Sequence, residues 1–352
     1  MTSELSPRRA VSEMQAYSPP QSGRLGKLRL DFNENTVGCS PKVVEAITSA
    51  VTAETLSMYP EYSLARATVA EFLGVDAEQM TFTNGTDEAI ALLLNTFVEA
   101  GTDVLVLAPS YAMYRFYGEL AGANVREVAY QVADNLAFPL QDLLDAITPN
   151  TRAICIANPN NPTGTPANEA ELRAVLAAAP HAAVLVDEAY VEFSGVTAIS
   201  WLDEFPQLFV SRTFSKAFGM AGLRCGCLCS NERNVAWLRK AQSPYSVNVV
   251  AVAAAVAAVG DTQYVQNYVA EVLDSRRVVE AGLTELGLKW YESSGNFILF
   301  DVGDRAKTLR DKLSETGILI RDRSYEIAGC VRVTIGTRTQ MQKFLTELRS
   351  AL

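Results

Sequence analysis

The sequence predicts an α/β fold, with a mostly parallel seven-stranded sheet between helices in a large domain and a smaller α+β domain beside it. From residue 80 to residue 241, short apolar stretches alternate with stretches of helical spacing. The short stretches lack polar alternation, which is typical of parallel strands covered on both faces. After about Val250 the pattern changes to one long helix followed by alternating strands, which indicates the second domain.

The seven expected strands are short, and most of them are apolar. They are Met80–Thr83, Asp103–Ala108, Asn124–Ala129, Ala153–Ala157, Ala183–Val186, Leu208–Ser211 and Cys225–Cys229. Helices are expected at Tyr111–Ala121, Leu140–Ala146, Glu169–Ala178 and Arg233–Ala241, and after Asn84, where Ile90, Leu93, Leu94 and Phe97 recur at helical spacing.

The ends of the chain supply the rest of the expected architecture. We expect a polar arm at residues 1–16, a small domain from residues 17–45 and 256–352, and a large domain at 46–255. In the N-terminal part, a strand is expected at Leu28–Phe32 and helices from Pro41 and at Ser63–Leu73. In the C-terminal part, helices are expected at Thr262–Leu286, Ala306–Thr316 and Thr339–Leu352, with strands at Asn296–Asp301, Ile318–Arg321 and Val331–Ile335.

Composition excludes several classes of function. The net charge of −10 and a pI near 4.9 argue against nucleic acid or an anionic membrane as partner. Cys225, Cys227 and Cys229 alternate like a strand face and lack zinc-site spacing, and His181 is the only histidine, so no metal is expected. The first fifteen residues lack an apolar signal core and Val249–Val259 is too short to span a bilayer, so we expect a cytoplasmic protein.

Lys216 stands in the stretch of greatest chemical interest. It follows the apolar strand at 208–211, has the hydroxyl groups of Thr213 and Ser215 three and one residues before it, and Arg224 eight residues after it. An amine at a strand end can form a Schiff base, and the hydroxyls and guanidinium would suit a phosphate. Taken alone, the segment fits a solvated surface lysine better, because most lysines are surface charges.

Other polar groups also follow expected strands. Gly85 opens a helix whose start could bind an anion or could simply be capped. Asn161 lies in a rigid Pro- and Gly-containing loop, which could be a turn or a binding loop. Asp187 ends an apolar strand and therefore requires a cation opposite it, and Tyr111 could stack on a flat ring or pack on a helix. In the last expected strand, Arg332 predicts an anionic partner, with Arg321 converging on it, or else an internal ion pair.

These motifs, in this order, resemble the fold-type I (class II) aminotransferases that depend on pyridoxal phosphate, and within them the histidinol-phosphate aminotransferases. The resemblance rests on the stretches Asn84–Glu88, Asn161–Gly164, Asp187–Tyr190, Thr213–Phe218 with Arg224, Asn33–Asn35, Tyr59–Pro60 and Arg332–Arg338, and extends over nearly the whole chain beyond its first fifteen residues.

The resemblance implies a role for each matching residue. Lys216 would form the Schiff base with pyridoxal 5′-phosphate and then move the substrate proton, while Asp187 would keep the pyridine nitrogen protonated. Asn161 and Tyr190 would form hydrogen bonds with the oxygen on the cofactor ring, and Tyr111 would stack on the ring. The phosphate would lie among Gly85, Thr86, Asp87, Thr213, Ser215 and Arg224, with Tyr59 reaching the cofactor of a neighbouring subunit in a homodimer. The substrate's anionic end would meet Arg332, Arg321, Tyr17 and Asn33.

The implied reaction is transfer of an amino group from L-histidinol phosphate to 2-oxoglutarate, which belongs to histidine biosynthesis. The sequence departs from the family at Thr36, where a proline is usual, and in the short loop between Arg321 and Arg332. Both lie on the expected substrate side, so an aromatic amino-acid aminotransferase stays an open alternative. A decarboxylase of a phosphorylated amino acid and a non-catalytic regulatory domain are further alternatives.

Overall fold

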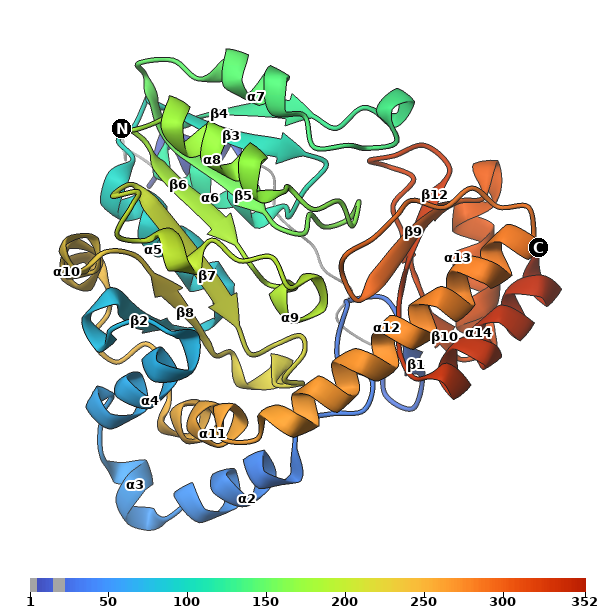
Figure 1. Ribbon diagram of the computed structural model, residues 1–352, viewed down its shortest axis with the longest axis horizontal. Coiled ribbons are helices and arrows are strands. Elements are labelled where there is room, and N and C mark those ends of the chain that lie inside the picture. Colours follow the sequence, from blue (N-terminus) through green and yellow to red (C-terminus); the bar gives the residue numbers. More distant parts are fainter. Residues whose placement is uncertain (1–4, 15–22) are drawn as a thin grey trace.

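A computed structural model describes residues 5–14 and 23–352, and its centre is a seven-stranded sheet (Figure 1). The strands lie in the order β2-β8-β7-β6-β5-β3-β4. β8 is antiparallel to both neighbours and the other neighbouring pairs are parallel, which confirms the predicted mostly parallel sheet. Their bounds are β2 Met80–Thr83, β3 Asp103–Ala108, β4 Asn124–Ala129, β5 Thr151–Ala157, β6 Ala183–Asp187, β7 Leu208–Thr213 and β8 Gly226–Cys229.

Helices cover both faces of this sheet. They are α5 Gly85–Phe97, α6 Met113–Ala121, α7 Leu140–Ala146, α8 Glu169–Ala178, α9 Val191–Ser194 and α10 Glu232–Ala241. Successive residues of one strand belong to two separate apolar clusters: Ile154 and Ile156 to one, Cys155 to the other. This alternation follows from the pleat of a strand and explains why the central strands are apolar throughout.

Three helices, α2 Pro41–Ala50, α4 Ser63–Leu73 and α11 Val249–Val259, pack together, and α4 lies against β2. α2, α3 Ala53–Ser57 and α4 precede the sheet in sequence, and α11 returns to lie against α2 and α4. The sequence pattern does not predict α3 or α11 as helices. Alanine and valine fill α11 on every side, so its sequence carries no amphipathic period, and it is largely buried.

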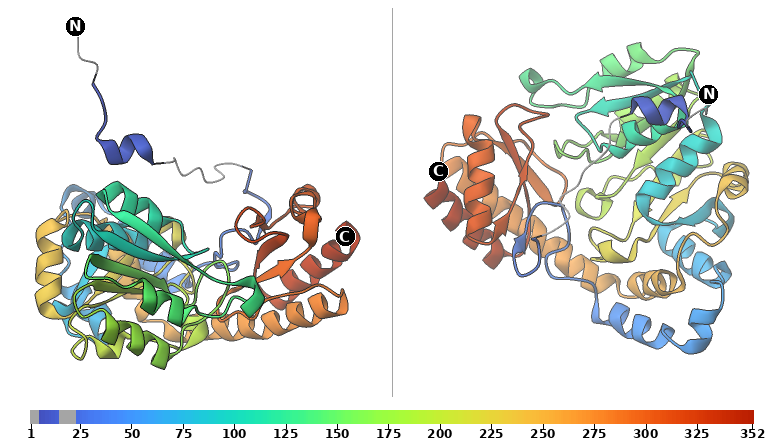
Figure 2. Two further views of the ribbon diagram at one scale, coloured as in Figure 1. Left: turned by 90° about the horizontal axis from the view of Figure 1, so that it is seen from above. Right: turned by 180° about the vertical axis from the view of Figure 1, so that it is seen from behind.

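A second, smaller sheet stands apart from the first and is connected to it by α12 Thr262–Glu285 (Figures 1 and 2). It has the order β11-β12-β9 and is antiparallel, with β9 Phe297–Asp301, β11 Arg321–Asp322 and β12 Cys330–Thr334. α13 Ala306–Glu315 and α14 Arg338–Ala351 pack beside it.

The predicted strands Ile318–Arg321 and Leu28–Phe32 are both wrong in detail. The first is two strands in different sheets: β10 Ile318–Leu319 pairs in parallel with β1 Leu28–Arg29, whereas β11 pairs with β12. The second ends at Arg29, because the chain changes partner: Leu30 donates its N–H to Leu319 and accepts from Thr334. Residues 31–35 thereby leave the sheet and turn toward the larger domain.

Two further features concern the ends and the helices of the chain. α1 Arg9–Glu13 lies near α6, where the Arg8 guanidinium donates to the carbonyl of Leu120. In the described ranges, no single helix is long and apolar enough to cross a membrane; only α11 and α12 taken together, bent by 77° at their junction, would pass by length and composition. The domain boundaries expected from the sequence stay a prediction.

Candidate active site

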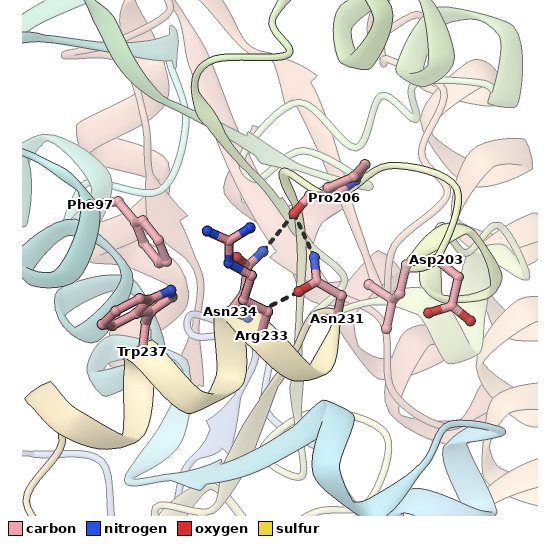
Figure 3. Close-up of a pocket in the computed structure, with 8 residues that line it drawn as sticks. Phe97, Asp203, Pro206, Asn231, Arg233, Asn234 and Trp237 are labelled. Atoms are coloured by element: carbon pink, nitrogen blue, oxygen red, sulfur yellow. Dashed lines mark hydrogen bonds between the residues drawn. The ribbon is translucent and has the colours of Figure 1, made fainter.

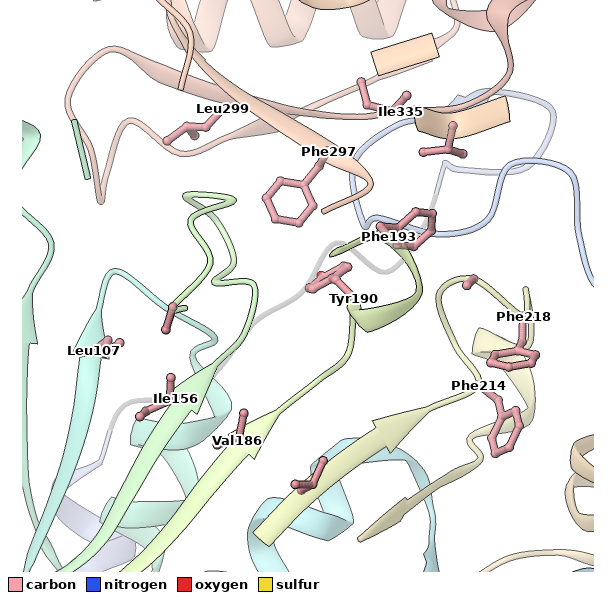
Figure 4. Packing of buried hydrophobic residues seen from close by; sticks show 14 of the residues in the cluster. Leu107, Ile156, Val186, Tyr190, Phe193, Phe214, Phe218, Phe297, Leu299 and Ile335 are labelled. Carbon is pink, nitrogen blue, oxygen red and sulfur yellow. The ribbon is translucent and has the colours of Figure 1, made fainter. Parts of the chain in front are cut away.

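The polar side chains gather where β5, β6 and β7 end, facing the second sheet. Parallel strands bring their carboxyl ends to one edge, so Asp187 of β6 and the residues after β7 lie close together. Figure 4 shows Tyr190 and Phe297 between the two sheets, and their rings meet edge to face at 5.1 Å. Lys216 lies in the same place: its Nζ donates to the carbonyl of Phe32 at 3.0 Å and lies 5.7 Å from the centre of the Tyr190 ring.

Asp187 is a buried carboxyl held by two hydroxyl groups. Tyr114 donates to its Oδ2 at 2.7 Å and Ser211 to its Oδ1 at 2.9 Å. Burial raises the pKa of Asp187 to about 6, although the two hydroxyl hydrogen bonds oppose the rise. Within residues 5–14 and 23–352, no lysine or arginine forms an ion pair with Asp187. A cationic group opposite Asp187 would therefore stabilise its ionised form, and a protonated ring nitrogen fits that requirement.

Gly85 and Arg224 form a compact pair at the start of α5. Gly85 has a left-handed φ of 73°, and a Cβ there would collide with the Arg224 guanidinium. Arg224 itself has φ 53° and donates to Asp87 Oδ2 at 3.0 Å, while Tyr111 donates to Asp87 Oδ1 at 2.6 Å. The predicted residues of this group are thus in contact with one another.

The sheet register brings Thr213 to the same place. Gly226 of β8 pairs with Thr213 on one side and with Thr83 on the other, and Gly85 follows Thr83 by two residues. Thr213 accepts a hydrogen bond from the Ser215 N–H at 3.1 Å. In the part of the chain that the structure describes, the buried Thr86 Oγ1 has no hydrogen-bond partner.

The helix start, the orphaned Thr86 hydroxyl and Arg224 together fit a phosphate group. The side chain of Asp87 would not bind this phosphate, because a carboxylate repels an anion. Only its backbone N–H, in the first turn of α5, could donate to one.

Arg332 lies in β12, directly opposite Arg321 of β11. It is buried and donates to the carbonyl of Asp31 at 2.6 Å and to the side-chain oxygen of Asn161. Burial, reinforced by the charges of Arg323 and Arg321, lowers the pKa of Arg332 to about 10. Among the described residues, neither Arg321 nor Arg332 pairs with a carboxylate, whereas Arg323 pairs with Glu326 at 2.7 Å. Two opposed, unneutralised cations favour an anionic ligand.

Asn33 connects the two halves of the site. With φ 55°, it donates from Nδ2 to the Tyr190 hydroxyl at 2.9 Å, and its backbone N–H donates to Thr334 at 2.9 Å. Tyr17, the other tentative substrate residue, lies outside the described residues. Tyr59 stands apart from the group: it is 75% exposed and its ring stacks on Tyr245 at 4.3 Å.

Three contributors to the site lie outside the residues predicted from sequence. Tyr114 and Ser211 hold Asp187, and the carbonyl of Phe32 receives Lys216. Tyr114 carries a usable signal, since it lies one helical turn after Tyr111 at the start of a helix that follows a strand of the same sheet. The Phe32 carbonyl has no side-chain signal, because any residue at this position would provide it.

The larger surface hollows lie elsewhere. One of about 400 Å³ lies between α10 and the end of α5, where Asn231 and Asn234 donate to the carbonyl of Pro206 beside Trp237 (Figure 3). It contains none of the predicted site residues. A smaller one of about 250 Å³ lies beside Ser215, between residues 34–38 and 219–222.

Comparison with known proteins connects this geometry to a family. Residues 26–348 match the family model of class I and II aminotransferases. The chain is 35% identical to histidinol-phosphate aminotransferase 2 of Methylococcus capsulatus, covering 97% of this chain and 98% of that protein. It is 36% identical to histidinol-phosphate aminotransferase of Symbiobacterium thermophilum, with 98% of each covered. The crystal structure of histidinol-phosphate aminotransferase from Sinorhizobium meliloti, solved with pyridoxal 5′-phosphate, has the same fold, with a TM-score of 0.88, 24% identity and 100% of each chain covered.

Proposed function

Because the chain belongs to the class I and II aminotransferase family and is an aminotransferase dependent on pyridoxal 5′-phosphate, we propose that its amino donor is L-histidinol phosphate. The acceptor is 2-oxoglutarate, and the products are imidazole-acetol phosphate and L-glutamate, a step of histidine biosynthesis. The observation that carries the proposal is the opposed pair Arg321 and Arg332, which offers two unneutralised cations to one anionic group. The names of the relatives at 35–36% identity support the same donor.

We propose that the chain holds the cofactor through the residues predicted from sequence. Arg224, Thr86, Thr213, Ser215 and the N–H groups that begin α5 would hold its phosphate. Tyr111 would lie on the ring, with Asn161 and Tyr190 at the ring oxygen. When bound, the cofactor supplies an electron sink for the carbon that carries the amino group.

Two residues would perform the chain's own chemistry. Asp187 would pair with the ring nitrogen and keep it protonated, since its buried carboxyl is otherwise without a cation. Lys216 would hold and move the proton of the substrate carbon, because its amine lies just beyond the end of β7 on a flexible four-carbon side chain. The buried rings of Tyr190 and Phe297 would help to exclude water from this proton transfer.

Arg332 would bind the donor's phosphate and, in the second half of the reaction, a carboxylate of 2-oxoglutarate or glutamate. Its present partners, Asn161 and the Asp31 carbonyl, are neutral, so an anion would make the stronger contact. Arg321 would add the second charge that a phosphate dianion requires and a carboxylate does not.

We further propose a cytoplasmic homodimer with shared sites and with the small and large domains at the boundaries given above. The six cysteines are free, which suits a reducing compartment. Exposed Tyr59 is available to a neighbouring subunit.

Substitution of the opposed arginines tests the donor. Arg321→Gln should raise KM for histidinol phosphate about 10- to 100-fold, because one charge-assisted contact is worth about 1.5–3 kcal/mol. It should change KM for glutamate much less. Arg305→Gln, at an exposed arginine after β9, serves as the control. An unchanged KM for histidinol phosphate in Arg321→Gln would contradict the proposed donor.

A further inference from the structure

The segment Asp31–Glu34 touches the active site at three successive residues. The carbonyl of Asp31 accepts from Arg332 at 2.6 Å, the carbonyl of Phe32 accepts from Lys216 at 3.0 Å, and Asn33 donates to Tyr190 at 2.9 Å. Two of these contacts come from the backbone. The position of the peptide, and not the identity of a side chain, therefore decides where the Lys216 amine rests.

The segment is not held by regular structure. β1 ends at Arg29, and Asn33 adopts a left-handed conformation that costs a non-glycine residue about 1 kcal/mol. Something outside the segment must therefore fix its path. Thr334 and Asn296 hold Asn33 from one side, through hydrogen bonds of 2.9 and 3.2 Å.

Arg24 holds the segment from the other side. Its guanidinium donates two hydrogen bonds to Asp31, at 2.8 and 3.1 Å, and two to Glu34, at 2.9 and 3.0 Å. It also lies over the Phe32 ring, 4.3 Å from the ring centre. One side chain thus spans the segment from its first residue to its last and covers the residue between them.

This ion cluster is partly shielded from water. The side chains of Arg24 and Glu34 are 22% exposed and that of Asp31 is 9% exposed. Burial opposes ionisation of Glu34, but hydrogen bonds from Arg24 and Arg29 outweigh it and hold its pKa below the usual value. Arg29 makes the weaker connection: its side chain is 42% exposed and, in the part of the chain that the structure describes, it donates one hydrogen bond, to Glu34 at 3.0 Å.

We propose that Arg24 is a positioning residue, which fixes the segment Asp31–Glu34 so that the Phe32 carbonyl receives the free amine of Lys216. The same contacts of Arg24 place the Asp31 carbonyl against Arg332. Arg24 therefore supports both the arginine that would bind the substrate anion and the Lys216 amine that would transfer the proton. Within residues 5–14 and 23–352, the Arg24 guanidinium forms hydrogen bonds with Asp31 and Glu34 and none with Arg332 or Lys216. The catalytic part of the inference rests on the proposed aminotransfer reaction; the structural part does not.

Arg24→Gln tests the proposal, with Arg29→Gln as the matched control. In the protein without substrate, Arg24→Gln should accelerate hydrogen exchange of the Asn33 amide, whose N–H donates to Thr334, at least about tenfold, measured by mass spectrometry of a peptide that contains residues 31–34. In the holoenzyme, kcat should fall about 10- to 100-fold, as expected when a reacting group is misplaced. The deuterium isotope effect of an α-deuterated donor should rise, because proton transfer by Lys216 becomes slower. Arg24→Lys keeps the positive charge but lacks the forked guanidinium, so it should recover only part of the lost kcat.

The outcomes separate a positioning role from a merely structural one. A lower melting temperature in Arg24→Gln with unchanged exchange at residues 31–34 and an unchanged isotope effect would overturn the proposal. Equal losses in Arg29→Gln, or full recovery in Arg24→Lys, would also contradict it. The isotope effect is measured with whichever donor the wild-type enzyme uses, and exchange needs no donor. Failure of the proposed donor would therefore be seen separately.

Discussion

Asp187 is a single buried residue that requires a cationic partner, and no lysine or arginine of the described residues pairs with it. Its position at the end of an apolar strand predicts a cation opposite it, and the structure buries the carboxyl with neutral donors, the hydroxyls of Tyr114 and Ser211 and the backbone of Ala189. The sequence points to the charged and conformationally restricted residues of the proposed site, since each is costly to bury or strain without a ligand. It misses Tyr114 and Ser211, because a hydroxyl near a buried carboxyl depends on tertiary contacts between β6, α6 and β7.

Tyr114→Phe should lower kcat about tenfold. The lost hydrogen bond favours the ionised form of Asp187 and is worth about 1.5–3 kcal/mol, so the pKa of Asp187 should rise further. The pH profile of kcat should consequently lose activity at a higher pH on its acid side. Tyr117→Phe, on the same helix, is the matched control and should match the wild type. An unshifted acid side in Tyr114→Phe would mean that the hydroxyl does not tune Asp187.

Stability of the cofactor-free protein should fall as pH rises from about 5 to 7. Burial raises the pKa of Asp187 to about 6 and of Glu192 to about 7, well above the value near 4 in an unfolded chain. Over this range the folded state binds more protons than the unfolded state, so the free energy of unfolding decreases with pH. Urea denaturation at several pH values measures it. Asp187→Asn should flatten the slope; an identical slope in the variant would rule out a contribution from Asp187.

At the scale of elements, the ends of β6 and β7 are joined by a buried ion pair behind the site. Arg212 of β7 pairs with Glu188, the residue after β6, at 2.8 Å, and also donates to Thr197 at 2.9 Å. Glu188 further accepts from Thr197 at 2.8 Å. This network fixes the strand ends that carry Asp187 and Thr213, so its integrity bears on the geometry of the site.

Arg212→Met should destabilise the protein by about 3–5 kcal/mol, because Glu188 would stay buried without its partner. The free energy of unfolding by denaturant measures the loss. Arg212→Met combined with Glu188→Gln should recover part of it. The control is Arg115→Gln, which breaks ion pairs at an arginine that is 54% exposed and should cost less than about 1 kcal/mol. A similar small cost for Arg212→Met would show that the pair is not important for stability.

The sequence predicts the bounds of a helix or strand where it has a local hydrophobic period. It fails where pairing with a strand that is distant in sequence sets the bounds. The bounds of α4, β2, β3 and α8 agree with the sequence pattern to the residue. The segment Ile318–Arg321, predicted as one strand, is divided between two sheets, since residues 318–319 pair with β1 whereas Arg321 pairs with β12. No local pattern records which strand will be a partner.

At the scale of the whole molecule, the site lies between the large sheet and the smaller one. Arg321 and Arg332 come from the second sheet, Lys216 and Asp187 from the first, and the segment Asp31–Glu34 crosses between them. The doubly wound pattern predicts the large sheet from sequence alone. That both sheets contribute residues to one site could be expected only from the family resemblance, because residues so distant in sequence share no local pattern.

The proposed role of Tyr59 requires a second subunit and therefore concerns the assembly of the whole molecule. Tyr59→Phe should weaken cofactor binding about 10- to 100-fold, through loss of one hydrogen bond to a charged phosphate. The protein should sediment as a dimer in both forms. Equal cofactor affinity for Tyr59→Phe and wild type, measured by absorbance titration, would remove Tyr59 from the phosphate site.

The most direct test of the proposed function is a comparison of kcat/KM for L-histidinol phosphate and L-phenylalanine, with 2-oxoglutarate as acceptor and Lys216→Ala as the inactive reference. We expect histidinol phosphate to be preferred by at least about 100-fold, since only its dianionic phosphate uses both Arg321 and Arg332. A preference for phenylalanine would identify an aromatic amino-acid aminotransferase and would contradict the central claim.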